Sequence, residues 1–426
     1  MTLVDRDRAV VWHPYTQMKT APPPLPIVRG QGIYLYTADG RKILDGISSW
    51  WVNIHGHSHP RLNQAIAEQA KTIEHVIFAG ATHEPAVELA ERLVGILPAG
   101  LTRVFYSDNG STAVEVALKM ALQYWQNQGQ PQRQRFVTLP HAYHGDTVGT
   151  MAVSDESVFT APFGSLLFPV DRVDAHEVPA HLQAHGDRVA AVIVEPMLQG
   201  AGGMIMWSAD ALAKIREACY RHGVLLIADE VLTGLGRTGR LFACEHASVT
   251  PDIICLSKAL TAGYMPMAVT ATTNAVYEAF LSDDRSKTFF HGHSFTANPL
   301  ACAVALASLD LIEEGDVLAR IARLERQLRE GLSPLAALPI VSDVRVLGDV
   351  GVVELLPDEA APNAGGYLAQ IGPRLSQAFL DRGVLLRPLG NVLYFMPPYV
   401  ITDSEVEWVI AQIRDVLSAL CHLPHL

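Results

Sequence analysis

Short apolar runs alternate with amphipathic segments over the first three quarters of the chain. The runs AAVIV (190–194), VLLIA (224–228) and DIICL (252–256) are almost continuously apolar, as in strands buried on both faces of a sheet. Between residues 61 and 100, apolar positions instead recur at i, i+3, i+4 and i+7, which predicts two amphipathic helices. This alternation is typical of an α/β fold with a mostly parallel sheet.

Further strands are expected at VFYS (104–107) and RFVTL (135–139), and each leads into a polar loop. The segments GIYLY and KILDGI flank the turn Asp39-Gly40 and predict a hairpin. The segment GYMPMAVTATT (263–273) predicts a pair of strands.

The strongly hydrophobic α/β pattern ends near Gly315 and gives way to helices and strands of a smaller α+β domain. We therefore expect a large domain over residues 49–314 and a small C-terminal domain over residues 315–426. Residues 1–48, an arm and a hairpin, are assigned to the small domain. Within that domain, the Ala/Pro/Gly-rich stretch Pro357 to Gly366 predicts a surface excursion.

Composition limits the possible partners of the protein. The 426 residues are 49% hydrophobic and 18% charged, as in a well-packed globular protein, and the net charge of −12 argues against nucleic acid or an anionic membrane as partner. No apolar stretch approaches the roughly 20 residues of a membrane span. The five cysteines form no C-x-x-C and the N-terminus does not resemble a signal peptide, so we expect a cytoplasmic protein with reduced thiols.

A carboxylate and a lysine follow two of the predicted strands. Asp229 ends one apolar run, and Lys258 comes just after the next. A pyridoxal phosphate enzyme needs this pairing, because the lysine binds the cofactor covalently and the carboxylate keeps the ring nitrogen protonated. A strand-end cap and a solvated loop lysine explain these two residues equally well.

Two hydroxyl-rich segments precede helices. Asp108-Asn109-Gly110-Ser111-Thr112 lies between a strand and an Ala-rich helix, where free N–H groups favour an anion. Ser294 stands in a similar place before the helix that follows it. An ordinary helix cap is the alternative for the first segment, but the presence of Lys258 favours a phosphate site.

Several aromatic and charged residues are candidates for the wall of a ligand pocket. Trp50 and Trp51 are adjacent on a predicted strand or loop, so we expect them to point to opposite sides. Tyr143 and Asp146 follow a strand end, where α/β proteins place ligands. Arg387 follows an apolar run and is interpreted either as a salt-bridge partner or as a carboxylate clamp.

Two other motifs suggest different chemistry, and we discount both. Gly234, Gly236 and Gly239 spell G-x-G-x-x-G, but five residues separate the strand from the first glycine and no clear helix follows, so NAD binding is disfavoured. The alternating histidines 55, 57 and 59 lie in a turn-forming segment with no nearby carboxylate ligand, and we expect no metal site there.

Taken together, these segments resemble the class III aminotransferases of fold type I, which depend on pyridoxal 5'-phosphate. The resemblance covers nearly the whole chain and rests on NGSTAVEVALKMA, YHGDT, IVEPMLQGAGGM, LLIADEVLTGLGRTG and LSKALTAG, in that order. It implies a large domain that binds the cofactor, a smaller α+β domain, and a homodimer with the site at the interface.

The resemblance also implies roles for individual residues. Lys258 would bind the cofactor and move the proton, and Asp229 would pair with the ring nitrogen. The remaining implied contacts are Gly110, Ser111 and the neighbouring subunit's Ser294 for the phosphate, Tyr143 for the ring, and Tyr15, Trp50, Trp51, Asp146, Tyr394 and Arg387 for the substrate, with Arg387 on its carboxylate. Arg237 would belong to a supporting loop.

Within this class, WHPYTQM, DGISSWWVNIHGHSHP, ALQYW and RPLGNVLYFMPPYV favour one reaction of biotin biosynthesis. In that reaction the α-amino group of S-adenosylmethionine is transferred to 8-amino-7-oxononanoate. A class III transaminase of ω-amino acids or diamines, and the same reaction with lysine as donor, are the alternatives. One departure is HGHSF (291–295), where the family more often has HGPTF; Ser294 keeps the hydroxyl, and the effect of His293 is open.

Overall fold

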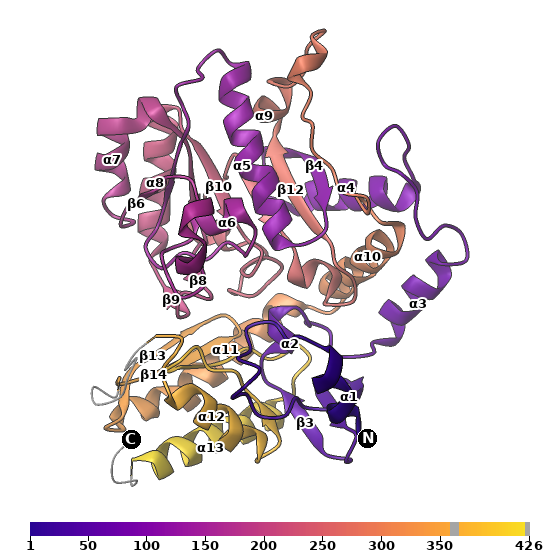
Figure 1. Cartoon of the computed structure of the whole chain (residues 1–426), viewed down its shortest axis with the longest axis vertical. Coiled ribbons are helices and arrows are strands. Elements are labelled where there is room, and N and C mark those ends of the chain that lie inside the picture. Colours follow the sequence, from indigo (N-terminus) through magenta and orange to yellow (C-terminus); the bar gives the residue numbers. More distant parts are fainter. Residues whose placement is uncertain (358–365, 422–426) are drawn as a thin grey trace.

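The computed structural model describes residues 1–357 and 366–421. A seven-stranded sheet in the order β4-β12-β11-β10-β7-β5-β6 forms the centre of the larger part of the molecule (Figure 1). Its strands are β4 (Leu101–Ser107), β5 (Arg135–Thr138), β6 (Asp171–Arg172), β7 (Val189–Val194), β10 (Leu225–Asp229), β11 (Ile253–Leu256) and β12 (Ala268–Thr273).

The sheet is mostly parallel, as expected, because only β12 runs against its two neighbours. The carboxyl ends of β4, β5, β7, β10 and β11 therefore meet at one edge. The prediction of two strands within residues 263–273 is wrong, since only β12 forms there. Gly263, with a φ of +80°, and Pro266 occupy the turn before it, and such residues interrupt a strand.

Helices cover both faces of this sheet, and the two-residue period of the strands separates the two cores. Ile254 packs with α4 (Glu84–Ile96) and α10 (Pro299–Glu314), whereas Ile253 and Cys255 pack with α5 (Gly110–Asn127). The other helices and the small ribbon of this part are α3 (Pro60–Gln69), α6 (Val148–Val153), α7 (Val178–His185), α8 (Ala209–His222), α9 (Asn274–Glu278), β8 (Leu198–Gln199) and β9 (Ile205–Met206).

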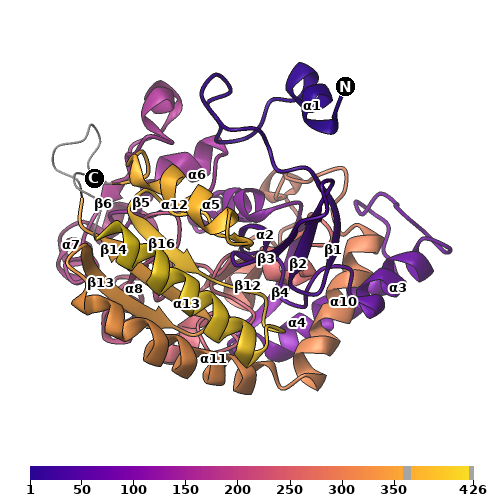
Figure 2. The same ribbon diagram turned by 90° about the horizontal axis from the view of Figure 1, so that it is seen from below.

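The smaller part of the molecule is built from both the N-terminal and the C-terminal segments of the chain. The predicted hairpin is present, with β2 antiparallel to β3, and the C-terminal β15 adds to β3 in parallel. Figures 1 and 2 show the indigo N-terminal strands and the yellow C-terminal helices in this same part. Its elements are α1 (Leu3–Val10), β1 (Ile27–Gln31), β2 (Tyr34–Thr37), β3 (Lys42–Asp45), α2 (Ser48–Trp51), α11 (Val317–Leu332), β13 (Val341–Leu347), β14 (Val350–Leu355), α12 (Ile371–Leu380), β15 (Val384–Leu385), β16 (Val392–Phe395) and α13 (Asp403–Leu420).

One hydrophobic core unites these distant segments, since Ile33 and Leu44 pack in the same cluster as Phe379 and Leu417. This packing supports our assignment of residues 1–48 to the small domain, and the three-part division remains a proposal. The excursion predicted from Pro357 to Gly366 falls almost entirely outside the described residues. Among the helices that the structure describes, none is both long and apolar enough to cross a membrane.

A buried ion pair ties the two parts together. The guanidinium of Arg237, in the turns after β10, contacts the carboxylate of Asp349 between β13 and β14, and both side chains are fully buried. The same guanidinium donates to the carbonyl oxygens of Trp51 (3.2 Å) and Pro397 (3.3 Å). Arg237 therefore belongs to a supporting contact, as the sequence resemblance implies.

We expect Asp349→Ala to lower the free energy of unfolding by about 3–5 kcal/mol, because it leaves a guanidinium buried without its carboxylate. Urea unfolding followed by fluorescence measures this change. The double variant Arg237→Met with Asp349→Leu should regain only part of the loss, because the carbonyls of Trp51 and Pro397 then lose their donor. Glu217→Gln, which breaks an exposed pair with Arg221, is the control and should change stability by less than about 0.5 kcal/mol. Equal effects of Asp349→Ala and Glu217→Gln would contradict the assignment.

Candidate active site

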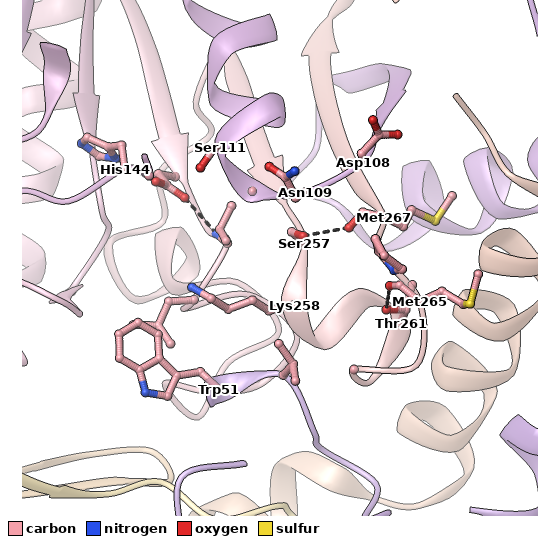
Figure 3. A pocket seen from close by; sticks show the side chains of 18 of the residues that line it. Trp51, Asp108, Asn109, Ser111, His144, Ser257, Lys258, Thr261, Met265 and Met267 are labelled. Carbon is pink, nitrogen blue, oxygen red and sulfur yellow. Dashed lines mark hydrogen bonds and ion pairs between the residues drawn. The ribbon is translucent and has the colours of Figure 1, made fainter. Parts of the chain in front are cut away.

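Two cavities, each of about 460 Å³, meet at Lys258 between the large sheet and the smaller part of the molecule. The cavity on the sheet side, which we call the cofactor cavity, includes the start of α5, Asp229 and Glu195. The other, the substrate cavity, includes Arg387. The two share Trp51, Val52, Tyr143 and Lys258. Figure 3 shows the Lys258 side chain next to Trp51, with Ser111 and Asn109 on the opposite side of the cofactor cavity.

Lys258 comes two residues after β11 and opens a short helical turn with a left-handed φ of +43°. This conformation is uncommon for residues other than glycine and concentrates at functional sites. Its ammonium nitrogen lies 4.8 Å from the centre of the Trp51 ring. Part of the lysine side chain borders the cavity, but its amine is buried. Burial lowers the pKa of this amine to about 8, although the negative charges of Asp229 and Glu195 act to raise it.

Asp229 is the last residue of β10 and is only 4% exposed. Its Oδ2 accepts a hydrogen bond from Nδ1 of His144 at 2.7 Å, and its Oδ1 accepts from the Val231 N–H at 3.1 Å. The His144 ring is fully buried, and its Nε2 has no hydrogen-bond partner among the described residues. A carboxylate fixed in this way at a cavity wall can hold a protonated ring nitrogen.

The amino end of α5 forms the opposite wall. Asn109 caps the helix, and the first N–H groups of a helix have no partners within it. A Cβ atom on Gly110 would lie 2.6 Å from a methyl group of Val231, and one on Gly145 would lie 2.0 Å from the Ser111 Oγ. Both glycines are therefore required sterically, and they leave the backbone accessible to a phosphate.

Glu195 was not among the residues predicted to act here. It follows β7, and its carboxylate accepts the backbone N–H groups of Tyr143 at 3.0 Å and Gly200 at 2.9 Å. Burial raises its pKa to about 7. The carboxylate thus joins two loops of the cofactor cavity, and its position after a buried strand was the signal available in the sequence.

Polar contacts connect the arm at the N-terminus to this site. The Tyr15 hydroxyl lies 3.0 Å from the Tyr143 hydroxyl and contacts the Asp146 carboxylate, which also accepts from Tyr143 at 2.9 Å. Tyr15 comes from the N-terminal arm, whereas Tyr143 and Asp146 lie three residues apart in one loop, and the three form one wall of the substrate cavity. Burial and the contact with Asp146 raise the pKa of Tyr15 to about 12, so its hydroxyl stays protonated at neutral pH.

The substrate cavity combines aromatic rings with one guanidinium. Arg387 lies 4.2 Å from the centre of the Trp50 ring and donates to the Tyr367 hydroxyl at 3.2 Å. The Trp51 indole donates to the Tyr394 hydroxyl at 3.0 Å. Arg387 has no carboxylate partner among the described residues, so the salt-bridge alternative lacks a partner and the guanidinium can meet a substrate.

Both tryptophans line the substrate cavity, and only Trp51, at 4% exposed, is fully buried in the core, so the expectation of opposite directions stays a prediction. All four residues from Ser48 to Trp51 have positive φ, so the backbone is neither a strand nor a regular helix and period-two alternation does not apply. The Trp51 carbonyl is held by Arg237 and its indole by Tyr394, which fixes this strained turn.

Ser294 does not line either cavity within one chain. It lies in the turn before α10, where Phe295 is 62% exposed. The preceding His293 lies 3.3 Å from the Asp108 carboxylate and 3.1 Å from His291. The unusual histidine therefore connects this loop to the residues just before α5.

Phe159 and Tyr367 were also missed, although both line the substrate cavity. Their segments carry no regular pattern in the sequence, and only packing brings them together. The resulting site fits pyridoxal phosphate: the start of α5 with Gly110 for the phosphate, Asp229 for the ring nitrogen, and Lys258 on the same cavity for covalent attachment.

Known proteins resemble this chain over nearly its whole length. The family model for "Aminotransferase class-III" matches residues 15–417. The chain is 50% identical to the adenosylmethionine-8-amino-7-oxononanoate aminotransferase of Synechococcus elongatus, with 96% of this chain and 99% of that protein covered. It is 44% identical to the protein of the same name from Geobacter sulfurreducens, with 96% of each covered.

Solved structures agree with these relatives. The crystal structure of adenosylmethionine-8-amino-7-oxononanoate aminotransferase from Methanocaldococcus jannaschii is 37% identical, has a TM-score of 0.94 and matches over 98% of each chain. The omega transaminase from Pseudomonas jessenii in complex with PMP is 28% identical, with a TM-score of 0.92 over 99% of each chain. This chain belongs to the class III aminotransferases, a family of pyridoxal phosphate-dependent transaminases of fold type I.

Proposed function

We propose that this protein transfers the α-amino group of S-adenosylmethionine to 8-amino-7-oxononanoate, giving 7,8-diaminononanoate in biotin biosynthesis. The observation that carries the proposal is the near full-length similarity to relatives named for this reaction. The substrate cavity supports it, because aromatic rings suit two differently shaped substrates and Arg387 suits a carboxylate. Lysine as donor, or an ω-amino acid or diamine substrate, remains the alternative.

Pyridoxal phosphate, when bound, supplies the electron sink that makes the carbon–hydrogen bond next to the donor amine acidic. The residues of this chain would divide the remaining work. Lys258, with its pKa lowered to about 8, is neutral in roughly a tenth of the molecules at pH 7, and the neutral amine can take a proton from the donor carbon. The same amine can then deliver the proton to the cofactor carbon on the other side of the transferred nitrogen.

The other residues would bind, orient and exclude water. Asp229 would hold the ring nitrogen in its protonated form, while His144 fixes the carboxylate. Gly110 and Ser111 would bind the phosphate at the start of α5, and Tyr143 would cover the ring. Trp50, Trp51, Tyr15, Asp146 and Tyr394 would enclose the substrate, whose carboxylate Arg387 would bind.

A homodimer is also part of this proposal. Ser294 lies outside the cavities of its own chain, on a loop with the exposed apolar side chains Phe290 (74%) and Phe295 (62%). We propose that a second copy covers this loop and receives the Ser294 hydroxyl at its phosphate. We further propose a cytoplasmic location, supported by five free cysteines, which are common in a reducing compartment.

The pKa of Lys258 can be tested in the cofactor-free protein. The rate at which an amine-reactive reagent labels Lys258, followed by mass spectrometry, should rise about tenfold per pH unit and level off above pH 8, because only the neutral amine reacts. Removing the carboxylate in Asp229→Asn should move the midpoint to lower pH. A midpoint near 10.5, the ordinary value for lysine, would contradict the lowered pKa.

Lys258→Ala should abolish transamination while the protein remains folded. We expect the rate of diamine formation to fall at least on the order of 10²–10⁴-fold, because the proton carrier is lost. The parental protein is assayed with 8-amino-7-oxononanoate and either S-adenosylmethionine or lysine. Product from S-adenosylmethionine alone supports the proposed donor, product from lysine supports the alternative, and parental activity in the variant refutes the role of Lys258.

Arg387→Ala should raise the KM for 8-amino-7-oxononanoate by about 10–100-fold, since a charge-assisted hydrogen bond contributes about 1.5–3 kcal/mol. Arg387→Lys keeps the charge but not the paired donors, so its KM should fall between those of the other two proteins. The exposed Arg382, whose guanidinium donates to the Ala378 carbonyl and lines neither cavity among the described residues, provides the control Arg382→Ala. Equal KM values for the Arg387 and Arg382 variants would remove Arg387 from the site.

A further inference from the structure

A smaller cavity of about 290 Å³ adjoins the substrate cavity. The two share Tyr143, Phe159, Ala201 and Tyr367, so the space leading away from Lys258 has two branches. We call the smaller branch the side cavity. The residues that line the side cavity alone are 155–158, His141, Ala142, Gly202, Gly366 and Leu368.

Aromatic rings line the point where the branches separate. The centre of the Phe159 ring lies 4.7 Å from the centre of the Tyr367 ring and 6.0 Å from that of the Tyr143 ring. Both pairs are edge-to-face, with the ring planes about 70° apart. Val158 and Leu368, which are 48% and 50% exposed, add apolar surface to the side cavity. Such walls suit a flat heterocycle, because aromatic and apolar side chains bury its faces without demanding one hydrogen-bond pattern.

The two branches differ in charge. The substrate cavity contains the cationic groups of Arg387 and Lys258 together with the Asp146 carboxylate, whereas the described lining of the side cavity holds no lysine or arginine and includes Asp155 and Glu156. The Asp155 carboxylate is balanced by Arg172 at 3.3 Å and accepts the His141 N–H at 2.7 Å. Glu156 is exposed and forms no ion pair among the described residues, so it adds a solvated negative charge to this wall.

The two proposed substrates differ at the end remote from the reacting carbon. The amino donor carries a sulfonium cation and a nucleoside, and the acceptor carries a carboxylate. A sulfonium placed beside Arg387 would meet a like charge in a partly desolvated site, which is unfavourable. The carboxylate of the acceptor gains from the same guanidinium. Both substrates can use one reacting centre only if their remote ends diverge.

We propose that the side cavity is the subsite for the nucleoside end of S-adenosylmethionine. The sulfonium, which lies between the reacting carbon and the nucleoside, would pass the Phe159 and Tyr367 rings at the branch point, and the base would lie beyond it against Val158 and Leu368, with Glu156 adding negative charge to the same cavity. This assignment rests on the proposed function for its donor. It makes Glu156 and Phe159 determinants of donor specificity, while Arg387 serves the acceptor.

The test uses the full-length, cofactor-loaded protein and adenosine as a probe of the nucleoside site. Val158→Trp should fill the side cavity, lower the affinity for adenosine by at least about tenfold in calorimetry, and raise the KM for S-adenosylmethionine to a similar extent. The KM for 8-amino-7-oxononanoate should stay within about twofold. Val28→Trp, at a valine of β1 that is 62% exposed and lines neither cavity, is the matched control.

A second variant separates the charge from the shape of the side cavity. Glu156→Gln should raise the KM for S-adenosylmethionine several-fold and leave the affinity for uncharged adenosine within about twofold. Glu156→Asp should keep most of the parental KM, because it retains the carboxylate. A Glu156→Gln variant with parental KM values would remove Glu156 from donor binding.

The outcomes distinguish this inference from the proposed function. If the parental protein forms the diamine but Val158→Trp leaves both adenosine binding and the KM for S-adenosylmethionine unchanged, the side cavity is not the subsite. Failure of the parental protein to bind adenosine would overturn it as well. If adenosine binding is lost in Val158→Trp while neither donor yields the diamine, the nucleoside site stands and the proposed reaction fails.

Discussion

The buried guanidinium of Arg237 is the contact on which the geometry of the site depends. It comes from the turns that follow β10, the strand that carries Asp229, and it reaches Asp349 and the carbonyls of Trp51 and Pro397 in the smaller part. A Cβ atom on Gly348 would lie 2.1 Å from the Arg237 carbonyl oxygen, so the two backbones touch there. The distance between the sheet edge and the Trp51 wall is thereby fixed.

The residues suited to the cofactor and those suited to the substrates come from different parts of the molecule. The edge of the parallel sheet supplies Asp229, Lys258, Glu195 and the start of α5, which are the groups suited to the cofactor. The smaller part and the N-terminal arm supply Trp50, Arg387, Tyr394 and Tyr15, which are suited to substrates. Relatives that share the first set can therefore differ in substrate through changes in the second, because the two sets lie on separate segments of the chain.

Strain at the junction follows from this arrangement. Lys258 and the residues from Ser48 to Trp51 adopt left-handed backbone conformations. Nearby, the Trp51 indole is hydrogen-bonded to Tyr394 and the Asp229 carboxylate to His144, and both bonds are buried. Such conformations persist only where neighbouring contacts fix them. Helix and strand periods in the sequence could not anticipate these turns, so period-two alternation does not apply to Trp50 and Trp51.

The sequence alone determined the α/β pattern, the hairpin around Asp39-Gly40, and the two successive strands, one ending in Asp229 and the other followed by Lys258. These features depend on local periodicity and turn residues. Together with the family resemblance, it also named many of the residues that line the two cavities, although it missed Glu195, Phe159 and Tyr367. Tertiary structure alone decided that β15 joins β3, that Glu195 and His144 support the cofactor cavity, and that Phe159 and Tyr367 divide the space beyond it. These contacts join residues far apart in the chain, and no local pattern encodes the packing that brings them together.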